Sequence, residues 1–175
     1  MIDVDFTQYQ YGTSITNQYT GTGVTFSGLN NPNVFIGAAY FGNGSNGTGL
    51  THSVTNPFPG AVNGISAYFL NPISFISVDV HANRIGSSLL MDAFDINGLL
   101  INQYSYYQPD FYKDHASLEF SSAVSRIKWY SSEPNQTPVA IRNLSFKIPE
   151  PNSLFLFLPF VLLFMFRQQG AALAC

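Results

Sequence analysis

Charged side chains are scarce in this chain. Asp, Glu, Lys and Arg together make up 10% of its 175 residues, against about 25% in a typical soluble domain. The seven Lys and Arg residues form no cluster, and a protein that neutralises nucleic-acid phosphates needs one, so the composition argues against nucleic-acid binding. Cysteine is nearly absent as well: Cys175 is the only one. It can close no disulfide within the chain, and it leaves no set of thiolates for a metal site.

Apolar residues are plentiful by contrast. They make up 46% of the chain, with 16 Phe and 10 Tyr, which is ample for a hydrophobic core and argues against intrinsic disorder. Up to residue 148 they fall in short runs with period-two alternation, separated by turn residues, and no sustained 3.6-residue stripe occurs. This pattern predicts an all-β domain over residues 1–148, an antiparallel β-sandwich or jelly roll. The predicted strands lie at residues 2–6, 23–28, 33–41, 65–70, 73–81, 116–122, 124–132 and 139–148, with a hairpin over 88–107.

Three local signals refine this prediction. Residues 42–50, "GNGSNGTGL", contain four Gly and two Asn and predict a loop. The sequence "DING", residues 95–98, supplies the Asn-Gly pair favoured in type I′ turns, at the tip of the predicted hairpin. In the last apolar run the parity of the apolar positions changes near Asn143, which indicates a β-bulge.

The composition changes sharply at Pro149-Glu150-Pro151. Prolines at both ends keep this tripeptide extended, so we place the domain boundary there and treat 149–175 as a separate tail. Residues 154–166 are all apolar and predict a helix over about 153–166. Thirteen helical residues span about 20 Å, less than the about 30 Å of a bilayer core, but their apolar character favours lipid by a few kcal/mol. We therefore expect a membrane-inserted helix. The alternative is a final core element of the domain, which should show a polar face that this run lacks.

"IPEP", the apolar run and Arg167 together resemble the PEP-CTERM sorting signal of exported bacterial proteins. In that family the tripeptide precedes a transmembrane helix and a short basic cluster, and a membrane enzyme called an exosortase recognises and cleaves the signal. The resemblance implies that Pro149, Glu150, Pro151 and Arg167 are the sorting motif, with the membrane and an exosortase-type enzyme as partners. It also implies a transient stay in the inner membrane, followed by transfer to the cell surface or an exopolysaccharide matrix. Here Arg167 alone follows the helix, where the family carries several basic residues, and Pro159 interrupts the apolar run.

The body of the chain resembles the β-sandwich ectodomains that precede this signal, which are similar to galactose-binding-like jelly rolls. The likeness is carried by "ITNQYTGTGVTFSG" (15–28), "DAFDINGLL" (92–100) and "VAIRNLSF" (139–146). Arg142 stands where the closing motif of those ectodomains carries Asp. If that Asp binds Ca²⁺ in relatives, this chain has lost the ligand.

No residue pattern singles out a catalytic site. Glycoside cleavage needs a pair of carboxylates, and no spacing selects two among Asp3, Asp5, Asp79, Asp92, Asp95, Asp110, Asp114 and Glu119. The three histidines, His52, His81 and His115, are far apart, whereas zinc ligands occur in close pairs. A Ser-His-Asp triad can assemble from distant positions, but the chain has no Gly-x-Ser-x-Gly elbow. We therefore name no catalytic residue and expect a non-enzymatic protein.

Calcium is the one cofactor for which the sequence offers candidates. Oxygen-rich loops and acids at strand ends suit a hard cation. The candidate ligands are Asp3, Asp5, Asp95 and Asn97. Turn formation explains each of these residues as well.

The densest aromatic stretch is "QYSYYQPDFYKDH", residues 103–115. The candidate carbohydrate-binding rings in it are Tyr104, Tyr106, Tyr107, Phe111 and Tyr112. They cannot all point inward from one strand and a Pro-containing loop, so some are exposed and can stack on sugars or on other proteins. The alternative is that they alternate as core and edge tyrosines.

Together these features predict an exported, non-enzymatic surface or extracellular-matrix protein that binds polysaccharide. Because "MIDVDFTQY" shows no basic segment followed by an apolar run, we expect the true start, with its export signal, to lie upstream. Two alternatives remain open: an extracellular hydrolase acting on polysaccharide, and a structural module that adheres to other proteins.

Overall fold

The computed structural model describes residues 1–29, 33–40, 46–51, 64–82, 88–107, 114–132 and 139–150. Within these ranges ten strands form one sheet in which every pairing is antiparallel. This all-β architecture confirms the fold class that the alternating apolar runs predict. The elements are β1 (Ile2–Val4), η1 (Phe6–Gln8), β2 (Ser14–Ile15), η2 (Thr20–Thr22), β3 (Val24–Gly28), β4 (Val34–Tyr40), β5 (Asn46–Thr51), β6 (Gly64–Ala82), β7 (Ser88–Phe94), β8 (Leu100–Tyr107), β9 (Asp114–Ser131) and β10 (Val139–Lys147), where η marks a short 3-10 helix.

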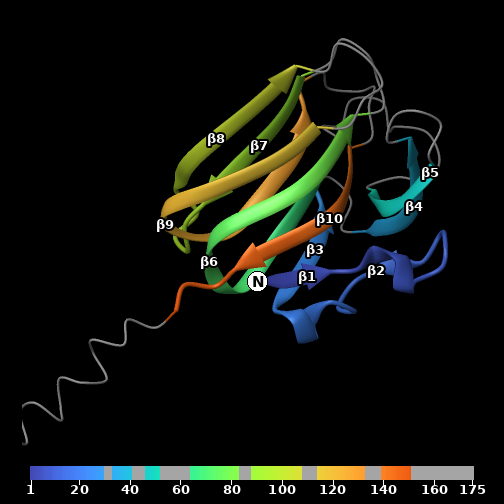
Figure 1. The fold of residues 1–175 in the computed structure, drawn as a ribbon, viewed down its shortest axis with the longest axis horizontal. Helices are drawn as coiled ribbons and strands as arrows, with labels where there is room; N and C mark the ends of the chain where they lie inside the picture. Colours follow the sequence, from blue (N-terminus) through green and yellow to red (C-terminus); the bar gives the residue numbers. More distant parts are fainter. Residues whose placement is uncertain are drawn as a thin grey trace, which may run out of the picture.

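Two long strands fold the sheet into two layers. β6 and β9 pair with each other on both sides of a bend, which register shifts place between Tyr68 and Phe75, and in Figure 1 both strands turn back on themselves. Pro72 lies in this bend, where a residue without a backbone N–H is tolerated. The first half of β6 pairs with β3 and the second half with β10. One layer is therefore β3-β6-β9-β7-β8, and the other is β9-β6-β10-β5-β4-β2.

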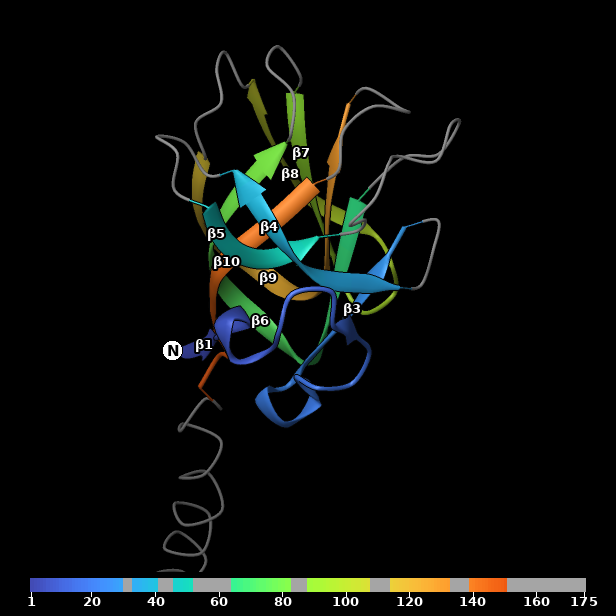
Figure 2. The same cartoon turned by 90° about the vertical axis from the view of Figure 1, so that its right-hand side faces the viewer.

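β10 joins the parts of the second layer. Its beginning pairs with β5, and its end pairs with β1, while β4 and β5 cross the near side of the molecule in Figure 2. The β-bulge predicted near Asn143 is confirmed, because the register of β10 with β6 shifts between Arg142 and Ser145. Asn143 has a φ of 49°, the left-handed conformation that Asn tolerates better than most residues.

The hydrophobic core lies between the two layers. β6 supplies Ile65, Ala67 and Phe69 from its first half and Ile76, Val78 and Val80 from its second, and the change from odd to even positions follows from the bend. Near η1 and η2 the core is aromatic: Phe6, Tyr19 and Phe26 meet edge to face, with ring centroids 5.4 to 5.8 Å apart. Each fully buried side chain of this size contributes about 1.5–3 kcal/mol to folding.

Part of the loop predicted at 42–50 is a strand. β5 pairs along its length with β4 and, at Leu50 and Thr51, with β10. Gly disfavours strands, but both neighbouring strands hydrogen-bond to β5 and Leu50 is fully buried. Tertiary pairing therefore overrides the local preference. Residues 42–45 lie outside the described ranges.

Two pairs of predicted strands are each one continuous strand. The runs at 65–70 and 73–81 both belong to β6, and those at 116–122 and 124–132 belong to β9. The break between the first pair was predicted at Asn71-Pro72, and the structure places there the bend that β6 shares with β9.

The hairpin over 88–107 is present, but its turn is not of type I′. That type needs positive φ at both Asn97 and Gly98, and Asn97 lacks it. The Gly98 N–H donates to the Asp95 carbonyl (3.1 Å), the Asp95 N–H donates to the Leu99 carbonyl (3.0 Å), and Gly98 has a φ of 81°. This is a type I turn followed by a left-handed glycine, the usual form of a three-residue hairpin loop.

Among the described residues, no helix is long and apolar enough to cross a membrane. The membrane helix predicted at about 153–166 lies outside the described ranges, as do Pro151 and Arg167 of the sorting motif. Pro149 and Glu150 are described, and both are exposed directly after β10.

Candidate functional site

The outer surface of β6, β9, β7 and β8 carries aromatic, cationic and hydrogen-bonding side chains in register. Residues paired directly across antiparallel strands point to the same side of a sheet, and the alternate residues of these strands are buried in the core. The rows across the four strands are Tyr68, Arg126, Phe94 and Leu100; Ser66, Lys128, Asp92 and Gln103; and Gly64, Tyr130, Leu90 and Ser105. Tyr107 lies two residues after Ser105 on β8, on the same side of the sheet, and pairs with Ser88 of β7. We call this surface the aromatic face and define it by Tyr68, Asp92, Phe94, Gln103, Tyr107, Arg126, Lys128 and Tyr130.

Asp92 is held in place at the centre of the aromatic face. Its carboxylate accepts hydrogen bonds from Gln103 Nε2 (2.7 Å) and from the Tyr130 hydroxyl (3.0 Å), and the residue is 6% exposed. Burial of the phenol, reinforced by the Asp92 carboxylate, raises the pKa of Tyr130 to about 12. The hydroxyl therefore keeps its proton at neutral pH and remains a donor to Asp92.

Rings and cations alternate around Asp92. The Arg126 guanidinium lies 4.1 Å from the centroid of the Phe94 ring, and the Lys128 ammonium lies 4.6 Å from that of Tyr130. Both are cation–π contacts. Tyr68 on β6 and Tyr107 on β8 are 43% and 60% exposed. The face thus has an accessible ring on each of its two outermost strands.

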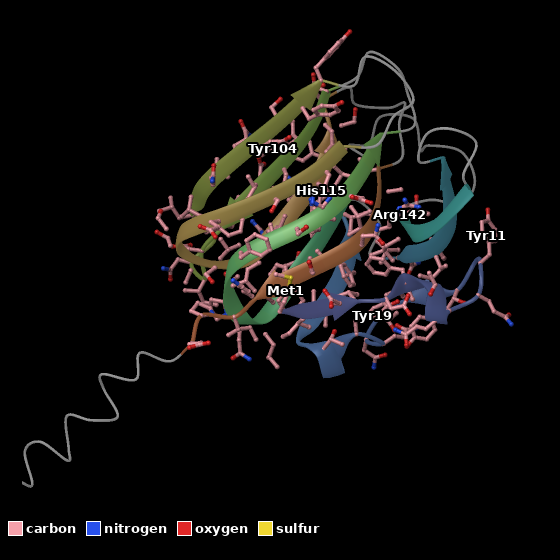
Figure 3. All side chains as sticks on the ribbon, in the orientation of Figure 1. Met1, Tyr11, Tyr19, Tyr104, His115 and Arg142 are labelled. Atoms are coloured by element: carbon pink, nitrogen blue, oxygen red, sulfur yellow. The ribbon has the colours of Figure 1, made fainter. Side chains whose placement is uncertain are left out.

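The structure does not bring the five predicted carbohydrate-binding rings onto one surface. Along β8, Tyr107 is exposed and belongs to the aromatic face, whereas Tyr104 and Tyr106 lie opposite buried residues of β7. Tyr104 packs against the core, and Figure 3 shows it on β8. Tyr104 and Tyr106 therefore follow the alternation of core and edge tyrosines that was the alternative interpretation. Phe111 and Tyr112 lie outside the described residues.

A second cluster lies on the other layer, over β9, β6 and β10 (Figure 3). His115, Asp79 and Arg142 pair directly across these three strands, and Ser77 is two residues before Asp79 on the same side of β6. His115 Nδ1 lies 2.7 Å from Asp79 Oδ1, and His115 Nε2 lies 3.2 Å from Ser77 Oγ. A hydroxyl, an imidazole and a carboxylate in this order form the chain of contacts that activates a serine in acyl transfer.

Asp79 is fixed from its other side by β10. The residue is 3% exposed, and its Oδ2 accepts hydrogen bonds from Asn143 Nδ2 (2.7 Å) and Arg142 Nε (3.4 Å). The bulge in β10 is what allows two consecutive side chains to reach the same carboxylate. Buried carboxylates need such partners, because an unpaired one would cost several kcal/mol.

Sequence patterns alone do not predict that Ser77, Asp79 and His115 lie together. The segment "SVD" places Ser77 and Asp79 on one side of a strand, and this period-two spacing is the local signal that points to part of the cluster. His115 is 36 residues from Asp79 along the chain, and only the register of β6 against β9 brings them together. The triad therefore had to be left open at the level of sequence.

The predicted Ca²⁺ ligands lie in two separate places. Asp5 follows β1 and caps η1, accepting hydrogen bonds from the Thr7 hydroxyl (2.6 Å) and the Thr7 N–H (2.8 Å), which lower the pKa of Asp5. Asp95 and Asn97 belong to the β7–β8 turn, where hydrogen bonds from the backbone N–H groups of Leu99 and then Asn97 lower the pKa of Asp95. Turn and cap formation thus account for the position of these carboxylates.

Asp3 and Asp5 line a pocket of about 290 Å³ together with Arg142. In the part of the chain that the structure describes, no group of three or more His, Cys, Asp or Glu side chains could hold a metal ion.

No family model and no curated protein matches this chain. Among solved structures it is similar to an arabinose-bound α-L-arabinofuranosidase (11% identity, TM-score 0.48, 77% of this chain and 24% of that chain). It is also similar to an exo-β-agarase (13% identity, TM-score 0.46, 72% and 23%) and to a family 29 carbohydrate-binding module from Piromyces equi (13% identity, TM-score 0.44, 78% and 85%). The chain spans about a quarter of the length of the two enzymes. At these identities and TM-scores, the likeness carries no ligand or activity over to this chain.

Proposed function

We propose that this protein binds polysaccharide through the aromatic face without cleaving glycosidic bonds. The observation that supports the proposal is the arrangement of accessible rings and fixed hydrogen-bonding groups on one open sheet surface. A sugar ring presents an apolar C–H face, which stacks on an aromatic ring, and hydroxyl groups at its edge, which pair with carboxylates, amides and cations. Tyr68 and Tyr107 supply the rings, and the exposed amide of Gln103, held in place by the buried Asp92, supplies a donor and an acceptor between them.

The charge of the aromatic face indicates which polysaccharides to test first. Arg126 and Lys128 contribute two positive charges against the single carboxylate of Asp92, whereas the whole chain carries a net charge of -3. A locally positive surface on a negative protein attracts anionic ligands. We therefore expect uronic-acid polysaccharides to bind more tightly than neutral ones, with an affinity that falls as salt is added.

Removing the two exposed rings tests the binding proposal. We expect the double substitution Tyr68→Ala and Tyr107→Ala to weaken binding about 10-fold or more, because two stacking contacts of about 0.5–1.5 kcal/mol each are lost. Isothermal titration calorimetry against a panel of neutral and uronic-acid polysaccharides measures the change. Both rings are on the surface, so the variant should keep the fold.

Tyr11→Ala is the matched control for this experiment. Tyr11 is 66% exposed and lies on the opposite side of the molecule from Tyr104 on β8 (Figure 3). It removes an exposed ring without touching the aromatic face, so binding should be unchanged. Failure of the unmodified protein to bind any polysaccharide in the panel would refute the proposed function, and an equal loss in the Tyr11 variant would refute the assignment to this face.

We also propose that the protein is displayed at the cell surface or in an extracellular matrix. The support for this is the sequence of residues 148–167, which resembles a PEP-CTERM sorting signal. In the described structure β10 ends at Lys147, and Pro149 and Glu150 follow it on the surface. A processing enzyme can therefore reach Pro149 and Glu150 without unfolding the domain.

A further inference from the structure

We propose that Ser77, His115 and Asp79 form an acyl-transfer site that hydrolyses carboxylic esters. Ser77 is the nucleophile, His115 is the general base, and Asp79 positions the imidazole. The site lies on the layer formed by β9, β6 and β10, whereas the aromatic face lies on the outer surface of β6, β9, β7 and β8. It is thus a separate activity from polysaccharide binding.

The distances define which nitrogen of His115 carries the proton. An ionised carboxylate can only accept hydrogen bonds, so the contact of 2.7 Å between His115 Nδ1 and Asp79 Oδ1 places the proton of the neutral ring on Nδ1. Nε2 then holds a lone pair and accepts the Ser77 hydroxyl proton across 3.2 Å. This is the tautomer that a general base for serine requires.

Asp79 is buried and His115 is exposed, and this difference suits the role proposed for each residue. The Asp79 side chain is 4% exposed and that of His115 is 56% exposed. Asp79 is immobilised by Asn143 and Arg142, so it can hold one orientation of the ring. The exposed side of His115 and the hydroxyl of Ser77 remain accessible to a substrate from solvent.

The reaction proceeds in two balanced steps. Ser77 Oγ forms a bond to the carbonyl carbon of an ester while its proton moves to His115 Nε2; the C–O bond to the alcohol then breaks, and the alcohol leaves with that proton. Water attacks the resulting acyl-serine, passes a proton to His115 Nε2, and releases the carboxylic acid as the proton returns to Ser77 Oγ. No oxidant or metal takes part, and water is the only co-reactant.

The strand pairing at Ser77 indicates the class of ester. At Ser77, β6 is paired on both sides, with Ser117 of β9 and Ser145 of β10, so the backbone N–H groups of β6 around Ser77 are engaged in the sheet. Stabilisation of an oxyanion by free N–H groups is a large part of catalysis on unreactive esters. We therefore expect turnover of aryl and other activated esters, whose leaving groups need little assistance.

Two probes test the site in the full-length protein. Hydrolysis of p-nitrophenyl acetate measures turnover, and a fluorophosphonate, which bonds covalently to an activated serine, reports the nucleophile by peptide mass spectrometry. We expect the fluorophosphonate adduct on Ser77. We expect Ser77→Ala and His115→Asn to lower kcat/KM by about 100-fold or more, the usual worth of nucleophile activation, while circular dichroism shows an unchanged fold.

Ser117→Ala is the matched control, because Ser117 lies directly opposite Ser77 on β9, is exposed, and makes no contact with His115 in the described hydrogen bonds. It should leave hydrolysis and labelling unchanged. Absence of an adduct on Ser77, equal loss in the Ser117 variant, or full labelling of Ser77 in the His115 variant would each overturn the proposal. Such a result leaves polysaccharide binding unaffected, since the calorimetric experiment reports on the other layer.

Discussion

Tyr130 and Asp92 show how one buried contact sets the chemistry of a surface. Because the folded pKa of Tyr130, about 12, exceeds the ordinary tyrosine pKa of 10.0, this group contributes stability that is fully present below pH 10.0 and is lost as the pH rises towards 12. We expect Asp92→Asn to lower the pKa of Tyr130, since the substitution removes a nearby negative charge. Burial still acts on the phenol, so its pKa should stay above 10.0. Absorbance at 295 nm during alkaline titration measures the change.

Tyr130→Phe identifies the phenol that moves. The absorbance step that the unmodified protein shows and the Tyr130→Phe variant lacks belongs to Tyr130. Among the tyrosine steps, Asp92→Asn should shift only this one to lower pH. If the step stays at the same pH in the Asp92 variant, the contact between the carboxylate and the phenol is absent in solution, and the fixed geometry at the centre of the aromatic face is lost with it.

At the bulge in β10, the left-handed backbone of Asn143 places its side chain against the buried carboxylate of Asp79. Asn143 has positive φ, and its Nδ2 donates to Asp79. We expect Asn143→Gly to lower the free energy of unfolding by about 1–3 kcal/mol, because a hydrogen bond to a buried charge is lost. Asn143→Ala loses the same bond and adds about 1–2 kcal/mol of left-handed strain, so it should be the less stable of the two. Urea unfolding followed by circular dichroism measures both.

The comparison of the two Asn143 variants separates conformation from hydrogen bonding. Neither variant can donate to Asp79, so the difference between them reports the backbone alone. Equal stabilities would show that residue 143 does not adopt a left-handed conformation in solution, and the bulge would then not place Arg142 and Asn143 together on Asp79.

The described hydrophobic core is formed by residues that precede the tail. All the described core side chains lie between Val4 and Phe146, and the N-terminal strand pairs with the end of β10. We expect a chain ending at Ile148 to be soluble and folded, with the same urea midpoint as the domain in the full-length protein. The full-length chain should partition into lipid vesicles, and the shortened chain should not, as measured by vesicle flotation.

A chain ending at Arg142 provides the contrast. It lacks Leu144 and Phe146 from the core and the part of β10 that pairs with β1, so we expect it not to fold. If the chain ending at Ile148 also precipitates while the full-length chain stays soluble, residues of the tail belong to the core and the proposed sorting signal is wrong.

Local sequence signals predicted most of the strands correctly. The period-two runs located β3, β7, β8 and β10, a nearly continuous apolar run located β4, and the change of parity located the bulge at Asn143, because these patterns are properties of a single strand. The errors have a common cause. β5 is a Gly-rich segment that is a strand because β4 and β10 pair with it, and the bend in β6 and β9 is a feature of two strands together.

The amino-acid sequence by itself determined the all-β class, the hairpin at 88–107 and the change of composition at Pro149, since each depends on residues that are neighbours in the chain. The tertiary structure decided which side chains meet. It separated Tyr107 from Tyr104 and Tyr106, assembled the aromatic face, and placed His115 between Asp79 and Ser77. The physical reason is strand register: a shift of one residue between β6 and β9 would turn every side chain to the other side of the sheet, and that register is set by burial of the whole core.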